Sequence, residues 1–238
     1  MSMAIVVEAS LGSTRLPGKV LKMLAGRTLL EHTVTRLRAS GLPIIVAATT
    51  DAGDDPLEQA VSDLGASLYR GDAVDVLARV IGAASAFGLT EIVRANADHP
   101  AVDVGGVQRI AELRRRVHAD HAMECGLPQG TAVEAVTVEA LRRSHGLVTD
   151  PYDLEHVTSF IRRDTRFTAM RAVAPGHLRR PGLRLAVHSL EDLEFMQGVL
   201  SSTPTASPDA PLEEIIGVAE AVVVRLERAR LAATRKGA

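Results

Sequence analysis

The stretch LGSTRLPGKVL, residues 11–21, carries the strongest structural signal in this chain of 238 residues. It follows a run of apolar residues, Ala4–Val7, that predicts a buried strand. In open parallel α/β sheets, ligands bind beyond the carboxyl ends of the strands, where this segment would lie. Its glycines let the backbone approach an anion, and Arg15 and Lys19 add two cations. The stretch therefore predicts a loop that binds a polyphosphate.

This loop differs from the common phosphate-binding motif of nucleoside triphosphatases, in which Gly-Lys is followed by Ser or Thr. Here Val20 follows Lys19. A tight surface turn with incidental charges is the alternative interpretation of the same residues.

Short apolar runs alternate with helical patterns through the first half of the chain. We expect strands at residues 3–9, 43–48, 66–69 and 90–94, and helices at residues 54–64, 73–87 and 106–117. Another helix should begin at a capping box formed by Thr28 and Glu31 and end near Gly41. This β-α-β alternation predicts an α/β fold with a mostly parallel sheet, covered by helices on both faces.

The second half of the chain is less regular. We expect strands at residues 130–136 and 183–187, and helices at residues 139–145 and 154–163. Ser189 and Asp192 have capping-box spacing and should open a helix through about Leu200. A loop over residues 201–211 should precede a C-terminal helix over 211–235. We predict one domain over residues 1–238, with an inserted acceptor or dimerisation subregion around 118–170.

Composition and charge exclude several classes of function. Apolar residues make up 46% of the chain, charged residues 24%, and the net charge is −2. Such a charge gives no global attraction to nucleic acid or to an acidic membrane. No apolar run approaches the roughly 20 residues of a membrane span, and the N-terminus lacks a signal-peptide pattern. Cys125 is the only cysteine, which fits a reducing compartment. We therefore expect a cytoplasmic protein that binds neither nucleic acid nor membrane.

Residues Gly12–Leu21 closely resemble the nucleotide loop of the cytidylyltransferases that activate acidic sugars. These include the CMP-KDO and CMP-sialate synthetases and, in particular, the spore coat polysaccharide biosynthesis protein F family. The resemblance continues in order over roughly residues 3–200. The matching segments are Ala47–Pro56, Arg70–Leu77, Val93–Pro100, Glu155–Arg162 and Glu191–Phe195.

The resemblance implies a Rossmann-like nucleotidyltransferase fold of the glycosyltransferase-A type. It implies a metal-dependent enzyme that transfers CMP from CTP to an acidic sugar or sugar-like acceptor and releases pyrophosphate. A divalent cation, Mg²⁺ or Mn²⁺, would neutralise the charge that develops on the phosphates. The related synthetases are commonly dimers, so a homodimer is expected.

The resemblance also implies roles for individual residues. Arg15, Lys19 and Asp98 would be catalytic, and Asp98 and His188 would hold the metal. Glu134, His156 and Arg162 would contact the acceptor, although helix packing for His156 and an ion pair for Arg162 are equally plausible. His99 is expected to point to water, and the alternative is that it lies near one metal together with Asp98 and His188. The nucleotide would be bound by Ala9, Leu11, Gly12, Ser13, Arg15, Lys19, Thr50, Asp51, Arg70 and Arg94.

Four positions depart from the family's pattern. Glu8 and Ser10 stand where the family has a glutamine and an arginine, and Ala132 replaces an aspartate on the acceptor side. His188 replaces the second metal-binding aspartate. One carboxylate and one imidazole form a softer site than two carboxylates, which favours Mn²⁺ or Co²⁺ over Mg²⁺.

These departures leave two interpretations open, because they fall on positions of chemistry and spare the apolar scaffold. In the first, the enzyme is retuned for another acceptor, nucleotide or metal. In the second, the chain binds a nucleotide or sugar nucleotide and no longer catalyses. A glycosyltransferase of the same fold is a third class, but the 11–19 loop suits a triphosphate better than a diphosphate sugar.

Overall fold

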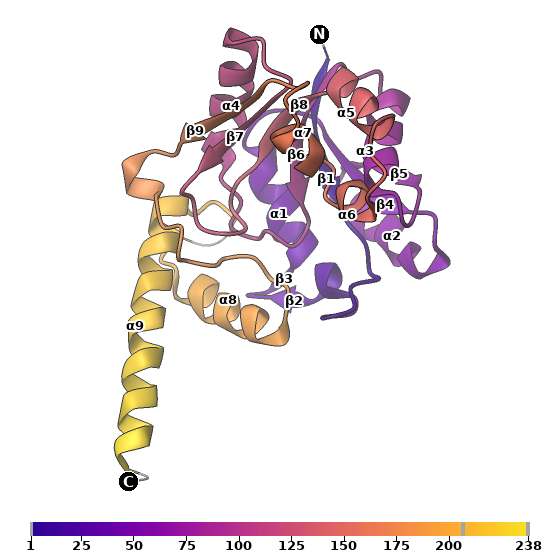
Figure 1. Ribbon diagram of the computed structural model, residues 1–238. Helices are drawn as coiled ribbons and strands as arrows, with labels where there is room; N and C mark the ends of the chain where they lie inside the picture. Colours follow the sequence, from indigo (N-terminus) through magenta and orange to yellow (C-terminus); the bar gives the residue numbers. More distant parts are fainter. Residues whose placement is uncertain (1, 206–207, 237–238) are drawn as a thin grey trace.

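The computed structural model describes residues 2–205 and 208–236. Within these ranges the centre of the molecule is a seven-stranded sheet with the order β5-β4-β1-β6-β8-β7-β9 (Figure 1). Strand β8 is antiparallel to both of its neighbours, and the other pairs are parallel. The sheet strands are β1 (Met3–Glu8), β4 (Ile44–Thr49), β5 (Ser67–Gly71), β6 (Glu91–Asn96), β7 (His121–Cys125), β8 (Glu134–Thr137) and β9 (Ala169–Val173). The predicted mostly parallel α/β architecture is confirmed.

Helices cover the two faces of the sheet, and a short hairpin follows the first loop. The hairpin consists of β2 (Met23–Leu24) and β3 (Arg27–Thr28). The α-helices are α1 (Leu29–Arg38), α2 (Pro56–Asp63), α3 (Val76–Ala86), α4 (Val104–Arg116), α5 (Val138–His145), α6 (Pro151–Glu155), α7 (Ser159–Arg163), α8 (Leu190–Ser202) and α9 (Leu212–Lys236). Three 3-10 helices lie at Lys19–Leu21, Ala52–Asp54 and Gly176–Leu178.

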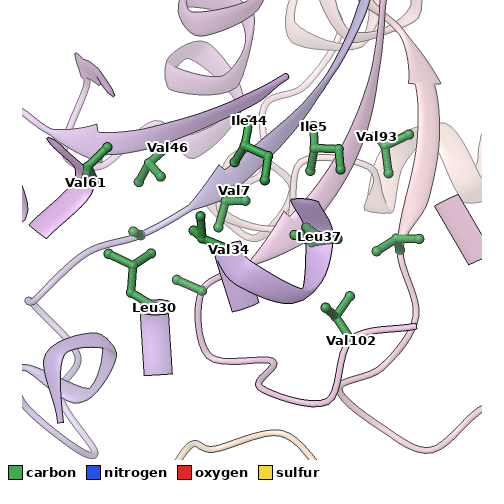
Figure 2. Close-up of a cluster of buried hydrophobic side chains, with 14 of the residues drawn as sticks. Ile5, Val7, Leu30, Val34, Leu37, Ile44, Val46, Val61, Val93 and Val102 are labelled. Atoms are coloured by element: carbon green, nitrogen blue, oxygen red, sulfur yellow. The ribbon is translucent and has the colours of Figure 1, made fainter. Parts of the chain in front are cut away.

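Alternation along β1 explains why both faces of the sheet are buried. Ile5 and Val7 belong to a core cluster with Val34 of α1, as Figure 2 shows. The intervening residues Ala4 and Val6 belong to a second cluster with residues of α3 and α5. Each side chain from Ala4 to Val7 therefore removes apolar area from water, a gain of roughly 25 cal/mol per Å².

A third cluster joins the C-terminal helices to the body. Met196 of α8 and Ile215 of α9 pack there against Leu185 and Val187. Beyond this contact, the last turns of α9 extend away from the rest of the molecule (Figure 1). In the described part of the chain, no helix is both long and apolar enough to cross a bilayer.

Both predicted capping boxes are confirmed, at Thr28–Glu31 and at Ser189–Asp192. Two predictions for the second half are wrong. The helix expected over 154–163 is two short helices, α6 and α7, because the backbone reverses at Val157, where φ is 49°. Residues 183–187 form no named strand and contribute one isolated bridge, between Gln129 and Arg184. Strands β7 and β9 were not predicted.

Candidate active site

A cleft of about 520 Å³ lies at the carboxyl ends of β1 and β6. Its walls come from the loop after β1, the start of α3, the end of β6, the junction of α6 and α7, and the segment before α8. A parallel sheet brings these sequence-distant segments together because its carboxyl ends share one edge.

The loop after β1 is anchored at several points. Gly18 has φ 67°, a conformation that glycine adopts readily, and its amide donates to the carbonyl of Leu11 at 3.0 Å. The Leu11 amide donates to Asp54 Oδ1 at 2.7 Å. Leu16 and Val20 are buried beneath the loop. These anchors place Arg15 and Lys19 on the wall of the cleft.

Lys19 and Asp98 form an ion pair across the cleft. Lys19 contacts Oδ2 of Asp98. Oδ1 lies 3.5 Å from His99 Nε2, and Oδ2 also lies 3.5 Å from His188 Nε2. Burial by itself would raise the pKa of Asp98, but the nearby His99, Lys19 and His188 lower it below its ordinary value. These neighbours therefore favour the ionised form of Asp98.

Asp98, His99 and His188 fit a divalent cation in donor type and spacing. One ligand atom from each lies within 4.8 Å of the others. A hydrogen bond from Arg184 to His188 Nδ1, at 2.7 Å, opposes this use. Because a guanidinium can only donate, Nδ1 accepts and the neutral ring carries its proton on Nε2. Metal binding at Nε2 therefore requires Arg184 to release Nδ1.

A second group of charges lies beside this cluster. Arg94 forms two hydrogen bonds with Glu8, one of them 2.9 Å from Nη2 to Oε2, and its Nη1 lies 3.4 Å from Glu134 Oε2. Glu134 also accepts a hydrogen bond from the Thr158 hydroxyl at 2.5 Å and lies 3.4 Å from Arg162. Glu134 and Thr158 are buried, and Glu8, Arg94 and Arg162 are partly buried. We call these five residues the buried ion network. It neutralises Glu8, whose charge would otherwise oppose a triphosphate.

Nine of the predicted site residues line the cleft: Ala9, Gly12, Ser13, Arg15, Lys19, Arg94, Asp98, His156 and His188. The others lie outside its lining, namely Leu11, Thr50, Asp51, Arg70, Glu134 and Arg162. Arg70 pairs with Asp55 and Glu58, each at 2.6 Å, and donates to the carbonyls of Thr49 and Asp51. Glu134 and Arg162 belong to the buried ion network.

The cleft also contains residues that the sequence did not indicate: Arg79, Asn96 and Glu155. His99, expected to point to water, lies beside Asp98 with 14% of its side chain exposed. For Arg79 a signal was available. It is a lone cation on the face of α3 that buries Val80 and Ala83. A charge among apolar helix positions indicates either a buried partner or a ligand.

Comparison with known proteins defines the family. A family model described as cytidylyltransferase matches residues 4–229. The spore coat polysaccharide biosynthesis protein SpsF of Bacillus subtilis is 29% identical over 221 residues, which cover 89% of this chain and 91% of SpsF. An uncharacterised protein of Methanocaldococcus jannaschii, MJ1063, is 29% identical over 193 residues, covering 80% of this chain and 79% of that protein.

Solved structures of related proteins have the same fold. A cytidylyltransferase of Leptospira borgpetersenii superposes with a TM-score of 0.85 at 25% identity, over 92% of this chain and 94% of that one. A CMP-KDO synthetase solved with CTP shares the fold, with a TM-score of 0.67 at 16% identity, over 84% of this chain and 99% of that one. The chain belongs to the cytidylyltransferase family, whose members are nucleotidyltransferase enzymes. The predicted Rossmann-like nucleotidyltransferase fold is confirmed.

Proposed function

We propose that this chain transfers CMP from CTP to an acidic sugar or sugar-like acceptor and releases pyrophosphate. The observation that carries the proposal is the meeting of Arg15, Lys19 and Asp98 in one cleft at the end of the sheet. Membership of the family and the similarity to SpsF and to a CTP-bound synthetase support the choice of CTP and of a sugar acceptor.

In this proposal the loop after β1 holds the triphosphate. Lys19 exchanges its contact with Asp98 for phosphate oxygens, Arg15 adds a second cation, and Gly12 and Ser13 line the approach. The acceptor hydroxyl forms a bond to the α-phosphorus, the bond to the β-phosphate oxygen breaks, and the hydroxyl proton passes to water. Fixed cations lower the barrier because negative charge grows on the departing pyrophosphate.

Asp98 and His188, with His99, would hold a divalent cation, Mg²⁺ or Mn²⁺. Bound there, it would supply charge neutralisation at the reacting phosphates. The acceptor would approach from the junction of α6 and α7, where His156 and Glu155 face the cleft. Arg162 and Glu134 would act on the acceptor only indirectly, through Arg94.

Pyrophosphate release, measured with the four nucleoside triphosphates, a panel of sugar acids and either metal, tests the proposal. CTP should be turned over with at least one acid. Binding without turnover is the second candidate, and a specific observation favours it: Arg184 holds His188 in the tautomer that does not bind metal. Calorimetric binding of CTP with no pyrophosphate release under any condition would establish that candidate.

The homodimer, which rests on the family resemblance, and the cytoplasmic location, which rests on cysteine content and the N-terminal pattern, remain proposals. Sedimentation of the purified chain would decide the first, and fractionation of the source cells the second.

A further inference from the structure

Arg79 is a buried cation that the proposed chemistry leaves unused. It lies in the first turn of α3, is 4% exposed, and lines the cleft. One terminal nitrogen donates to the carbonyl of Asp72. Within residues 2–205 and 208–236, its Nε has no hydrogen-bond partner and no carboxylate lies at ion-pair distance. Burial lowers its pKa, which reflects the cost of a charge kept from water.

Arg36 shows how this chain treats an arginine of equal burial. Arg36 is 3% exposed and donates to three backbone carbonyls, those of Val102, Pro208 and Ala210, at 2.8–3.1 Å. Those bonds satisfy its guanidinium inside the protein. Arg79 keeps most of its donors free, and its side chain borders an open cleft.

The acidic groups around Arg79 are engaged elsewhere. The charges that act on it are Glu8, Asp54, Asp72 and Asp75. Glu8 is held by Arg94, and Asp54 accepts from the Leu11 amide and from Thr49. Asp72 accepts from two backbone amides at 2.8 Å, and Asp75 from the Ala78 amide and His145. These carboxylates moderate the charge of Arg79 without accepting hydrogen bonds from it, so its one bond within the described residues is that from Nη1 to the Asp72 carbonyl.

The position of Arg79 in the cleft indicates which part of a ligand it meets. Lys19, His99 and His188 gather around Asp98, and Arg15 acts on His188, so the triphosphate belongs at that end. The charges that act on Arg79, namely Glu8, Asp54, Asp72 and Asp75, are a different set, and the apolar Val76 on the same helix also lines the cleft. With the phosphates at the Asp98 end, the nucleoside occupies the end formed by Arg79.

A guanidinium offers only donors, in a planar fork that suits two adjacent acceptors. Cytosine presents two such acceptors, its C2 carbonyl and N3, whereas uracil carries a hydrogen on N3. We propose that Arg79 donates to the C2 carbonyl and N3 of cytosine and so selects CTP over UTP. This inference rests on the proposed function, because it requires a nucleotide in the cleft.

The test is calorimetry of CTP, CMP and UTP binding to the full chain and to Arg79→Met and Arg79→Lys. Arg79→Met should weaken CTP and CMP binding alike, by about 10- to 100-fold, the range for hydrogen bonds to a charged group. UTP binding should change little, so the CTP-to-UTP preference should collapse. Arg79→Lys, which keeps the charge but loses the fork, should lose most of the preference. The ratio of two affinities in one preparation does not depend on how much of the variant is folded.

Arg36→Met is the matched control, because it removes an equally buried guanidinium outside the cleft. It should lower the melting temperature and leave the CTP-to-UTP preference unchanged. The inference is overturned if Arg79→Met weakens the binding of CTP and of inorganic pyrophosphate but leaves the binding of CMP unaffected, because Arg79 then contacts the outer phosphates. An unchanged CTP-to-UTP preference in both Arg79 variants would also overturn the inference. Failure of the wild type to bind any nucleoside triphosphate would defeat the proposed function as well.

Discussion

Two neighbouring groups of charges, one in the cleft and one that extends from the cleft into the protein, are built differently. Around Asp98, Lys19 makes a single ion pair and the two histidines stand 3.5 Å away. In the buried ion network, Arg94 makes two hydrogen bonds with Glu8 and reaches a second carboxylate. In the first group, a ligand that replaces Lys19 at Asp98 breaks a single ion pair. In the second group, the charged side chains are already paired with other members of the group.

This difference shows why charged residues of one cleft need not share a role. Removing one partner from a buried, multiply bonded pair leaves an uncompensated charge in a poorly solvated place. The side chains of Lys19 and Asp98 are exposed to a similar extent, 15% and 12% against 13% and 11% for Arg94 and Glu8, so the number of contacts, rather than burial, separates the two groups. We therefore expect the buried ion network to govern stability and the Asp98 cluster to govern binding.

The largest expected effect is on stability. Arg94→Met leaves the carboxylates of Glu8 and Glu134 without their shared cation, so the free energy of unfolding should fall by about 3–5 kcal/mol. Urea denaturation of the purified variant measures it. Arg166→Met is the control, since Arg166 is 57% exposed in its pair with Asp164 and its loss should cost less than about 1 kcal/mol. Equal losses in the two variants would remove the distinction between the two groups.

The next effect is the pH dependence of stability. Burial alone would raise the pKa of Glu134, but His121, Arg94 and Arg162 together lower it well below the ordinary value. A lowered folded-state pKa contributes stability that is present above the unfolded pKa of roughly 4.3 and is lost as the pH falls toward the folded one. Between pH 5 and pH 2 the wild type should lose on the order of 2 kcal/mol more than Glu134→Gln. If the wild type and Glu134→Gln lose the same stability as the pH falls, Glu134 is not the group that causes the pH dependence.

Binding should respond to the Asp98 cluster. Lys19→Ala and Arg15→Ala should each weaken CTP binding by about 1.5–3 kcal/mol, the range for hydrogen bonds to charged groups, and leave the fold intact. Calorimetry measures the affinity, and circular dichroism checks the fold. Lys22→Ala, three positions beyond Lys19 and outside the cleft lining, should bind CTP as the wild type does. Unchanged affinity in both cleft variants would show that the loop does not hold the triphosphate.

The first half of the fold could be predicted because its signals are local. Ile44–Ala48 is an unbroken apolar run, and the capping box at Thr28 specifies where α1 begins. Strand β7 escaped prediction because its sequence, HAMEC, includes His121 and Glu124, which are buried only by contacts from distant elements. Strand β9 lies at the edge of the sheet and is half-exposed, so its apolar pattern is weak.

The residues of the candidate site also fall into two sets, those that a local motif indicates and those that tertiary packing brings to the cleft. The loop residues stand together in the sequence, so one motif indicated all of them. Arg79 and His99 enter the cleft through the packing of α3 and the turn after β6, which no local pattern specifies. The break at Val157, a β-branched residue with positive φ, is imposed by tertiary contacts against its own preference. It brings His156 to the cleft while Thr158 bonds to Glu134.

The smallest expected effect concerns Arg184 and the metal. Its hydrogen bond keeps the lone pair of His188 on Nδ1, so Nε2 is closed to a cation. Arg184→Met should free Nδ1 to carry the proton and raise Mn²⁺ affinity by about tenfold, or about 1.4 kcal/mol.

Loss of a nearby positive charge would also raise affinity, but for Mg²⁺ as much as for Mn²⁺. Imidazole suits Mn²⁺ better than Mg²⁺, so a gain through His188 should be larger for Mn²⁺ and should disappear in His188→Ala. Electron paramagnetic resonance of free Mn²⁺, with Mg²⁺ as competitor, separates the two causes. An equal gain with and without His188 would mean that Arg184 acts by charge alone, and that Asp98 binds its cation without the imidazole.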